Sequence, residues 1–275
     1  MGTSHRHTAS VIGQPNWGKA SKSMTNIAKA VEESDNIAKN HPVNMTPQAI
    51  IKRQSILGMR VKNNYHHAVR NLIRAAGGRQ AVSSGVSRSL GHSGISGVSS
   101  WVNMMETIRE CGLEAWLTNK GRGSLNGKTC HDIVEIITNF INEDFVALDD
   151  TAAKEALESI MELLEKRLDG NPENFDAILH SVMSSDEIKN YIDHFFGIYI
   201  YSHLSQDFSE KIEKERGSEV MNQVMTEIKD LIIDDVSRGV HGRKAGQVNW
   251  NGEEGKQFIK DEFNRIIKIV TNNED

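Results

Sequence analysis

The sequence has few of the residues that mark disulfide-rich, membrane-spanning or β-rich proteins. Its 275 residues include two cysteines, Cys111 and Cys130, which are too few for a disulfide framework and fit a reducing cytoplasm. No apolar run approaches the length of about 18 residues that a membrane span needs, and the N-terminus lacks the apolar core of a secretory signal. Strand signals are nearly absent, because the β-branched runs fall within helical periodicity. We therefore expect an all-α protein of the cytoplasm.

Catalytic and metal-binding motifs are also missing. The stretch from Gly123 to Thr129 falls one residue short of a phosphate-binding loop, because Arg122 stands where that motif needs its first glycine. Gly91-His92-Ser93-Gly94-Ile95 lacks the final glycine of the Gly-x-Ser-x-Gly nucleophile motif. Neither Cys-x-x-Cys nor His-Glu-x-x-His spacing occurs. We expect no enzyme activity, no metal site and no cofactor.

Charge is distributed unevenly along the chain. Residues 1–90 carry 13 Lys/Arg and 3 Asp/Glu, and residues 91–275 carry the remaining 19 and 34, so the net charge of −5 divides into +10 and −15. No acidic residue lies between Asp35 and Glu106. Such a basic block meets the acidic half of its own chain, an acidic protein partner, or a nucleic acid or nucleotide. Its candidate anion or partner contacts are Lys52, Arg53, Arg60, Lys62, Arg70, Arg74, Arg79 and Arg88.

Helical signals run through most of the chain. Residues 1–18 are polar and predict a flexible tail, and Lys19 to Lys39 predicts a helix with a thin apolar stripe. Thr46-Pro47 predicts the start of a stronger helix, which Gly77-Gly78 ends. Its apolar positions are Ile50, Ile51, Leu57, Val61, Ala68, Leu72 and Ile73. After the tail we expect two units: a basic helical and Gly/Ser-rich segment, residues 19–100, and an acidic all-α body, residues 101–275.

The body shows further helix signals. Thr129 with Asp132 and Ser184 with Glu187 have the spacing of capping boxes that begin helices. Other helices are expected over residues 101–110, 149–168, 218–240 and 253–270. The helix after Ser184 carries an aromatic face that core packing explains best: Tyr191, Phe195, Phe196, Tyr199 and Tyr201.

The Gly/Ser-rich stretch from Gly77 to Ser100 has two interpretations. As a loop, it would be flexible. As a helix, the glycines at positions 91, 94 and 97 would form a smooth stripe that another element could approach closely. The sequence does not choose between them.

The N-terminus combines Gly2 with a later Pro15-Asn16-Trp17 element. Removal of Met1 would leave a glycine α-amine, which is partly uncharged near neutral pH, although most proteins that begin Met-Gly make no use of it. The Met-Gly-Thr-Ser opening, the Pro-x-Trp element, the basic segment, the Gly/Ser-rich stretch and the acidic helices together resemble the QatB component of Qat anti-phage systems. Typical members carry an apolar Pro-Leu-Val-Pro run before the Trp, whereas Gly13-Gln14-Pro15 here is shorter and more polar.

The resemblance implies a non-enzymatic defence component with three companions: a QatA-like ATPase, a QatC-like enzyme related to QueC, and a QatD-like nuclease related to TatD. It implies that the QueC-like enzyme joins a 7-deazaguanine-type group to the amine of Gly2. That enzyme would recognise Thr3, Ser4, Pro15 and Trp17. The alternatives are a nucleic-acid-binding sensor that uses residues 48–90, and a helical scaffold that recruits the ATPase.

Overall fold

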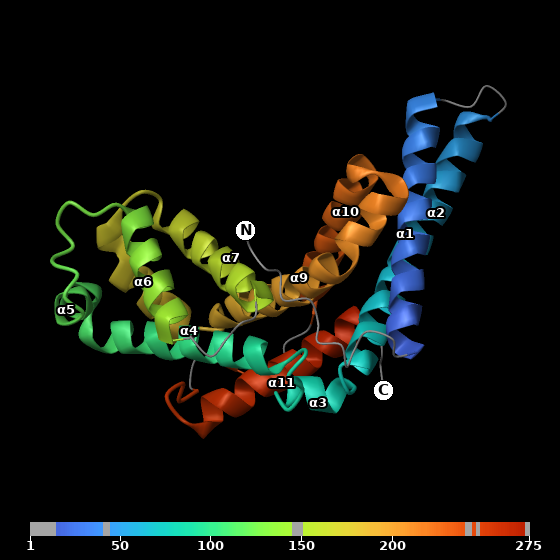
Figure 1. Ribbon diagram of the computed structural model, residues 1–275. Helices are drawn as coiled ribbons and strands as arrows, with labels where there is room; N and C mark the ends of the chain where they lie inside the picture. Colours follow the sequence, from blue (N-terminus) through green and yellow to red (C-terminus); the bar gives the residue numbers. More distant parts are fainter. Residues whose placement is uncertain (1–14, 41–44, 145–150, 240–243, 246–247, 273–275) are drawn as a thin grey trace.

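The computed structural model describes residues 15–40, 45–144, 151–239, 244–245 and 248–272. These residues form eleven α-helices and one short 3-10 helix and contain no strand, which confirms the expected all-α fold. In Figure 1, α4 to α8 lie on one side of the molecule and α1, α2 and α10 on the other. None of the helices in the described ranges is long and apolar enough to cross a bilayer.

The chain begins with a hairpin of two long helices, α1 (Pro15–Asn40) and α2 (Pro47–Ala75), which projects from the rest of the molecule (Figure 1). The expected start of α2 is confirmed, because Thr46 Oγ1 accepts a hydrogen bond from the Ala49 amide at 3.2 Å and Pro47 occupies the first turn. The last four residues of the expected tail, 15–18, belong to α1.

The Gly/Ser-rich stretch contains the short helix α3 (Arg79–Ser83) and the longer helix α4 (His92–Cys111). A Cβ placed on Gly94 would lie 2.6 Å from Tyr199 Cε1, and one placed on Gly97 would lie 3.0 Å from Phe195 Cζ. Such distances leave no room for a side chain. The helical interpretation is therefore correct from residue 92 onward, and two of its glycines let α4 approach the aromatic rings of a later helix.

The next helices are α5 (Leu113–Asn119), α6 (Cys130–Asp144), α7 (Thr151–Leu168) and α8 (Phe175–Ser184), with the 3-10 helix η1 (Pro172–Asn174) before α8. The capping box before α6 is confirmed. The Thr129 amide donates to Asp132 Oδ2 at 2.7 Å, and the Asp132 amide donates to Thr129 Oγ1 at 3.1 Å.

The capping box expected at Ser184 and Glu187 is wrong. Helix α8 runs through Ser184, whose hydroxyl donates back to the His180 carbonyl at 2.6 Å, and the next helix begins only at Ile188. The neighbouring Ser185 Oγ instead accepts from the Glu187 amide at 3.2 Å. The Ser-x-x-Glu spacing therefore pointed to Ser184, whereas the serine that bonds to the Glu187 amide is the next residue, Ser185.

Helix α9 (Ile188–Arg216) is the centre of the fold and packs against α1, α2, α4, α7, α10 and α11. Its buried residues lie on every face, as expected of a helix surrounded by others. Helices α10 (Ser218–Ser237) and α11 (Glu253–Val270) complete the chain. The aromatic face of α9 packs in the core, where the Phe196 and Phe263 rings stack with centroids 4.1 Å apart, while Tyr201 is half-buried.

Candidate functional site

The structure describes the base of the N-terminal tail but not its first residues. Gly2, Thr3 and Ser4 lie outside the described residues, and Pro15 is the exposed first residue of α1. The half-buried Trp17 packs on Phe208 of α9, with ring centroids 4.9 Å apart. One turn later, Lys211 Nζ of α9 donates to Ser21 Oγ at 2.7 Å. The point at which residues 1–14 join the body is therefore fixed against the central helix.

Three of the basic residues of α2 are engaged within the chain. Arg53 pairs with Glu33 of α1, Lys62 Nζ lies 3.1 Å from Asp235 Oδ1 of α10, and the Arg70 guanidinium donates to the Thr271 carbonyl. The contact of Lys62 agrees with the interpretation that the basic segment meets the acidic half of its own chain. Arg53, in contrast, finds its carboxylate within residues 19–100.

Asp235 is the centre of a largely buried polar cluster between α2 and α10. Its carboxylate accepts the Tyr65 hydroxyl at 2.7 Å, and His66 Nε2 lies 3.6 Å from it. Burial, together with the bond to the Asp235 carboxylate, raises the pKa of the Tyr65 hydroxyl. Burial lowers the pKa of His66, whose Nδ1 donates to the Val270 carbonyl at 2.9 Å. This cluster fixes the body end of the hairpin.

The other basic residues do not gather at one place. Lys52, Arg60, Arg74 and Arg88 are exposed and form no ion pair with a described residue, whereas the half-buried Arg79 begins α3. Lys52 and Arg60 lie about 12 Å apart along the outer half of α2, and Arg74 lies about 21 Å further along the helix. The expected anion contacts are therefore spread along the helix and not concentrated in one site.

Large apolar side chains are also exposed on the hairpin. Of the four exposed large apolar residues in the described ranges, three lie on the hairpin or next to it: Met45, Ile51 and Met59, with exposed fractions of 42%, 67% and 57%. The fourth, Val86 with 76%, lies between α3 and α4. The sequence interpretation grouped Ile51 with the other apolar positions of α2, and as a core position this was wrong. Ile51 lies one residue, or about 100° around the helix, from the half-buried Ile50, which takes it off the covered side of α2.

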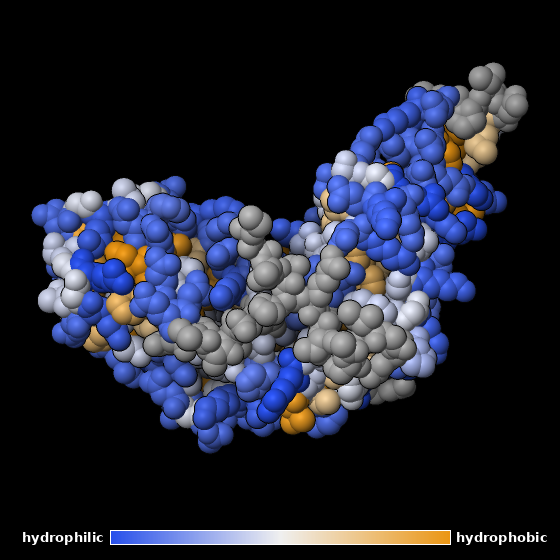
Figure 2. Space-filling model, viewed as in Figure 1, coloured by the Kyte–Doolittle hydropathy of each residue, from blue (hydrophilic) through white to orange (hydrophobic). Residues whose placement is uncertain are grey.

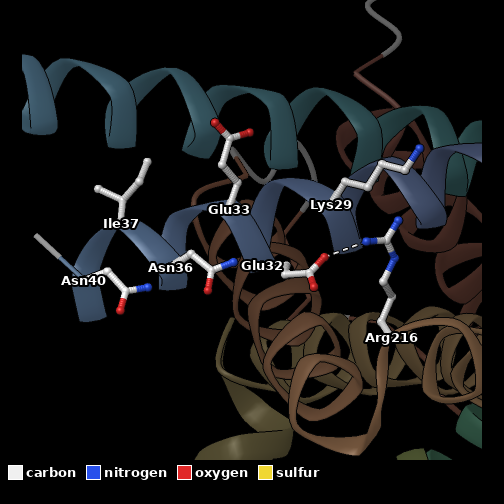
Figure 3. Close-up of a pocket in the computed structure, with 7 residues that line it drawn as sticks. All are labelled: Lys29, Glu32, Glu33, Asn36, Ile37, Asn40 and Arg216. Atoms are coloured by element: carbon white, nitrogen blue, oxygen red, sulfur yellow. Dashed lines mark hydrogen bonds and ion pairs between the residues drawn. The ribbon is translucent and has the colours of Figure 1, made fainter. Parts of the chain in front are cut away.

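Two hollows flank the outer half of α1. One, of about 520 Å³, is lined by five polar α1 residues, by Ile37, and by Arg216, which reaches from the end of α9 to bind Glu32 at 2.6 Å (Figure 3). The other, of about 670 Å³, lies between α1, α2 and α10, with Asp35, Glu227 and Asp230 among its lining residues. Both are open and have charged side chains among their lining residues, which suits contact with another macromolecule better than enclosure of a small ligand.

Groups that could carry chemistry are few in the described ranges. Ser159 Oγ lies 2.8 Å from His194 Nε2, as a nucleophile and base would, and burial lowers the pKa of His194. No described residue forms a hydrogen bond with the other ring nitrogen, so no carboxylate orients the imidazole as a catalytic triad requires. The pair joins α7 to α9. In the same ranges no three His, Cys, Asp or Glu side chains gather as metal ligands.

Comparison with models of known protein families places the chain beside an anti-phage family. The model of the family described as Qat anti-phage system associated protein QatB matches residues 81–270, which is more than half of the chain. The matched region runs from within α3 to the end of α11, and the α1–α2 hairpin precedes it. Neither the curated proteins nor the solved structures contain a match.

Proposed function

Because the chain belongs to the family of Qat anti-phage system associated protein QatB, we propose that it is the conjugation substrate of this defence system. As a member of that family, it is a component of an anti-phage system. In the proposed role it is not an enzyme and works in the cytoplasm. The amine of Gly2, exposed after Met1 is removed, accepts a 7-deazaguanine-type group from a QueC-like partner enzyme. The family match, together with the Met-Gly-Thr-Ser opening, carries this proposal.

The proposed chemistry is amide formation at the N-terminus. The partner enzyme uses ATP to convert the carboxylate of the 7-deazaguanine-type group into an acyl adenylate, with release of pyrophosphate. The uncharged Gly2 amine then attacks the acyl carbon, a C–N bond forms, AMP leaves and the amine gives up a proton. An α-amine has an ordinary pKa of about 7.7 to 8.0, so a useful fraction is uncharged at neutral pH. Because glycine has no side chain, the N-terminus of the chain can enter a narrow pocket of the enzyme.

The anchored base of the tail supports this role. Thirteen residues, Gly2 to Gln14, separate the acceptor from the start of α1, and a chain of that length spans at most about 45 Å. The packing of Trp17 on Phe208 fixes the origin of that span on α9. In this proposal the enzyme reads Thr3 and Ser4 beside the acceptor and contacts Pro15 and the half-exposed ring of Trp17 at the base.

The test is the intact mass of the full chain, expressed alone and together with the QueC-like enzyme. We expect loss of Met1 in both cases, and a base-sized adduct on the N-terminal peptide only after co-expression. Gly2→Pro should abolish the adduct, because a secondary amine in a ring cannot replace the glycine amine in a fitted pocket, while Gly13→Ala serves as a control within the tail. An unmodified mass in both cases would overturn the proposal.

A second candidate is a helical scaffold that recruits the ATPase. The exposed apolar residues on the projecting hairpin favour this scaffold over a nucleic-acid sensor. A sensor that used residues 48–90 would need free cations close together, whereas Arg53, Lys62 and Arg70 are engaged within the chain. Deletion of residues 2–14 separates the two functions. The conjugation substrate loses its acceptor, and a scaffold keeps its partner.

A further inference from the structure

The outer half of the α1–α2 hairpin is thin and poorly covered. Among the described residues between positions 31 and 56, Ile37 alone is buried. Three of the four exposed large apolar side chains of the described ranges, Met45, Ile51 and Met59, lie within this end of the hairpin or next to it. Figure 2 shows hydrophobic surface on the projecting arm. Single exposed apolar residues are ordinary, but a concentration of them on a projecting element marks an interaction site.

On α2 these side chains form a regular pattern. Ile51, Ser55 and Met59 are exposed and follow one another at intervals of four residues, so they line one side of the helix over about 12 Å. Lys52 and Arg60 directly follow the two apolar residues, are also exposed, and form no ion pair with any described residue. We call these five residues the α2 docking face. In this face an apolar residue followed by a basic residue occurs twice, and the two pairs lie about two helical turns apart.

We propose that the α2 docking face binds an acidic protein surface that has apolar pockets for Ile51 and Met59. Lys52 and Arg60 make the face positive, because α2 carries no acidic residue and neither side chain pairs with a described carboxylate, and the partner surface is therefore negative. Ile51 and Met59 would enter the pockets as anchors, as the apolar residues of a helix do when it lies in a groove.

The apolar anchors favour a protein over a nucleic acid as the occupant. Isoleucine and methionine have no aromatic ring on which a base could stack, and contact of Lys52 and Arg60 with phosphates would leave both apolar side chains in water. A protein partner contacts both the apolar and the basic side chains of the face. The hairpin precedes the region that the family model matches, residues 81–270.

The test uses the full-length chain and the three companion proteins of the proposed function, each purified, as probes. The inference rests on that function only in this choice of probes. Ile51→Gln/Met59→Gln removes the anchors and keeps a good helix former at each position. Val86→Gln is the matched control for loss of an exposed apolar side chain. Lys52→Gln/Arg60→Gln removes two charges, and Arg74→Gln/Arg88→Gln removes two others that are also exposed.

We expect one companion to bind the wild-type chain in calorimetric titrations. Loss of the two anchors should weaken that binding about 100-fold. Loss of Lys52 and Arg60 should weaken it about tenfold and flatten its dependence on salt between 50 and 300 mM. Both control variants should bind within twofold of wild type, and thermal melts should show that every variant is folded.

Three results would overturn the inference. One is that no docking at this face is detected, either because no companion binds or because both docking-face variants bind as tightly as wild type. Another is that a 30-base-pair DNA binds and weakens equally when either pair of charges is removed. The third is self-association of the chain that the anchor variant abolishes, since the face would then meet a second copy. The intact mass of the same variants reports on Gly2 separately, so failed conjugation and failed docking are distinguishable.

Discussion

Replacement of Gly94 by alanine tests whether α4 really lies against the aromatic face of α9. Gly94 is buried within α4, and a Cβ placed there would meet Tyr199 Cε1 at 2.6 Å and Tyr199 Cδ1 at 2.9 Å. Because carbon atoms pack best at about 3.5 to 4.0 Å, the ring or the helix would have to move by about 1 Å.

The ring of Tyr199 cannot move cheaply. It is fully buried, its hydroxyl accepts the Gly91 amide at 3.1 Å, and the His203 ring lies against it with centroids 4.6 Å apart. Overpacking of this kind costs about 1 to 3 kcal/mol, and a displaced hydroxyl forfeits about 1 kcal/mol more. Alanine returns about 1 kcal/mol through its better helix propensity. We expect Gly94→Ala to lower the free energy of unfolding by about 2 kcal/mol.

The matched control is Gly58→Ala in the middle of α2, where a new Cβ has no atom within 4 Å. The propensity gain is then unopposed, so the variant should be stabilised by about 0.5 to 1 kcal/mol. In scanning calorimetry, Gly94→Ala should melt about 6 °C below wild type and Gly58→Ala about 2 °C above it. If Gly94→Ala melts at or above the wild-type temperature, α4 does not approach Tyr199 as described.

Three further predictions concern the hairpin. Asp235→Ala should cost about 3 kcal/mol in unfolding free energy, because it leaves the buried Tyr65 hydroxyl without its acceptor, whereas Asp234→Ala, which breaks an exposed pair, should change urea unfolding by less than about 0.5 kcal/mol. Burial lowers the pKa of His66, so as the pH falls the unfolded chain binds a proton at this residue before the folded chain does. The free energy of unfolding should therefore decrease as the pH drops below about 6.5, and His66→Gln should make that decrease smaller in urea titrations. Trp17→Ala should cost about 1 to 2 kcal/mol and speed tryptic cleavage in the first turns of α1.

Each of these has a clear contrary result. Equal losses for Asp235→Ala and Asp234→Ala would mean that the buried cluster contributes no more than an exposed ion pair. A parallel decline of wild type and His66→Gln in acid would assign the acid sensitivity to other groups. Unchanged cleavage of Trp17→Ala would mean that the ring contact with Phe208 does not hold the start of α1.

Much of the fold follows from local sequence signals. Thr46 before proline, Gly77-Gly78, and Thr129 with Asp132 mark element ends that the structure confirms, because caps and glycines with positive φ act over three or four residues. The local rule failed at Ser184, where the serine was still within the preceding helix. It failed again at Ile51, because a list of apolar positions does not fix which face of a helix the neighbouring elements cover.

The parts of the site that depend on distant contacts could not be predicted. Trp17 and Phe208 are far apart in the sequence, and no pattern in either segment points to the other. The same holds for the close approach at Gly94, because the Tyr199 ring of the distant helix α9 lies where a side chain on Gly94 would be. The acceptor role of Gly2 depends on the family resemblance and stays a prediction.

The contacts that hold the hairpin have a consequence for synthesis of the chain. Tyr65 and Lys62 meet Asp235 at sequence separations of 170 and 173, and His66 meets Val270 at a separation of 204. At ribosomal rates of about 5 to 20 residues per second, roughly 10 to 30 s pass between the emergence of α2 and that of α10. The first helices made are therefore among the last to be completed. A chain truncated before α10 would keep the contacts of Trp17 and Ser21 with α9 but would lack the Asp235 and Val270 partners of α2, so the hairpin is fully fastened only when synthesis is complete.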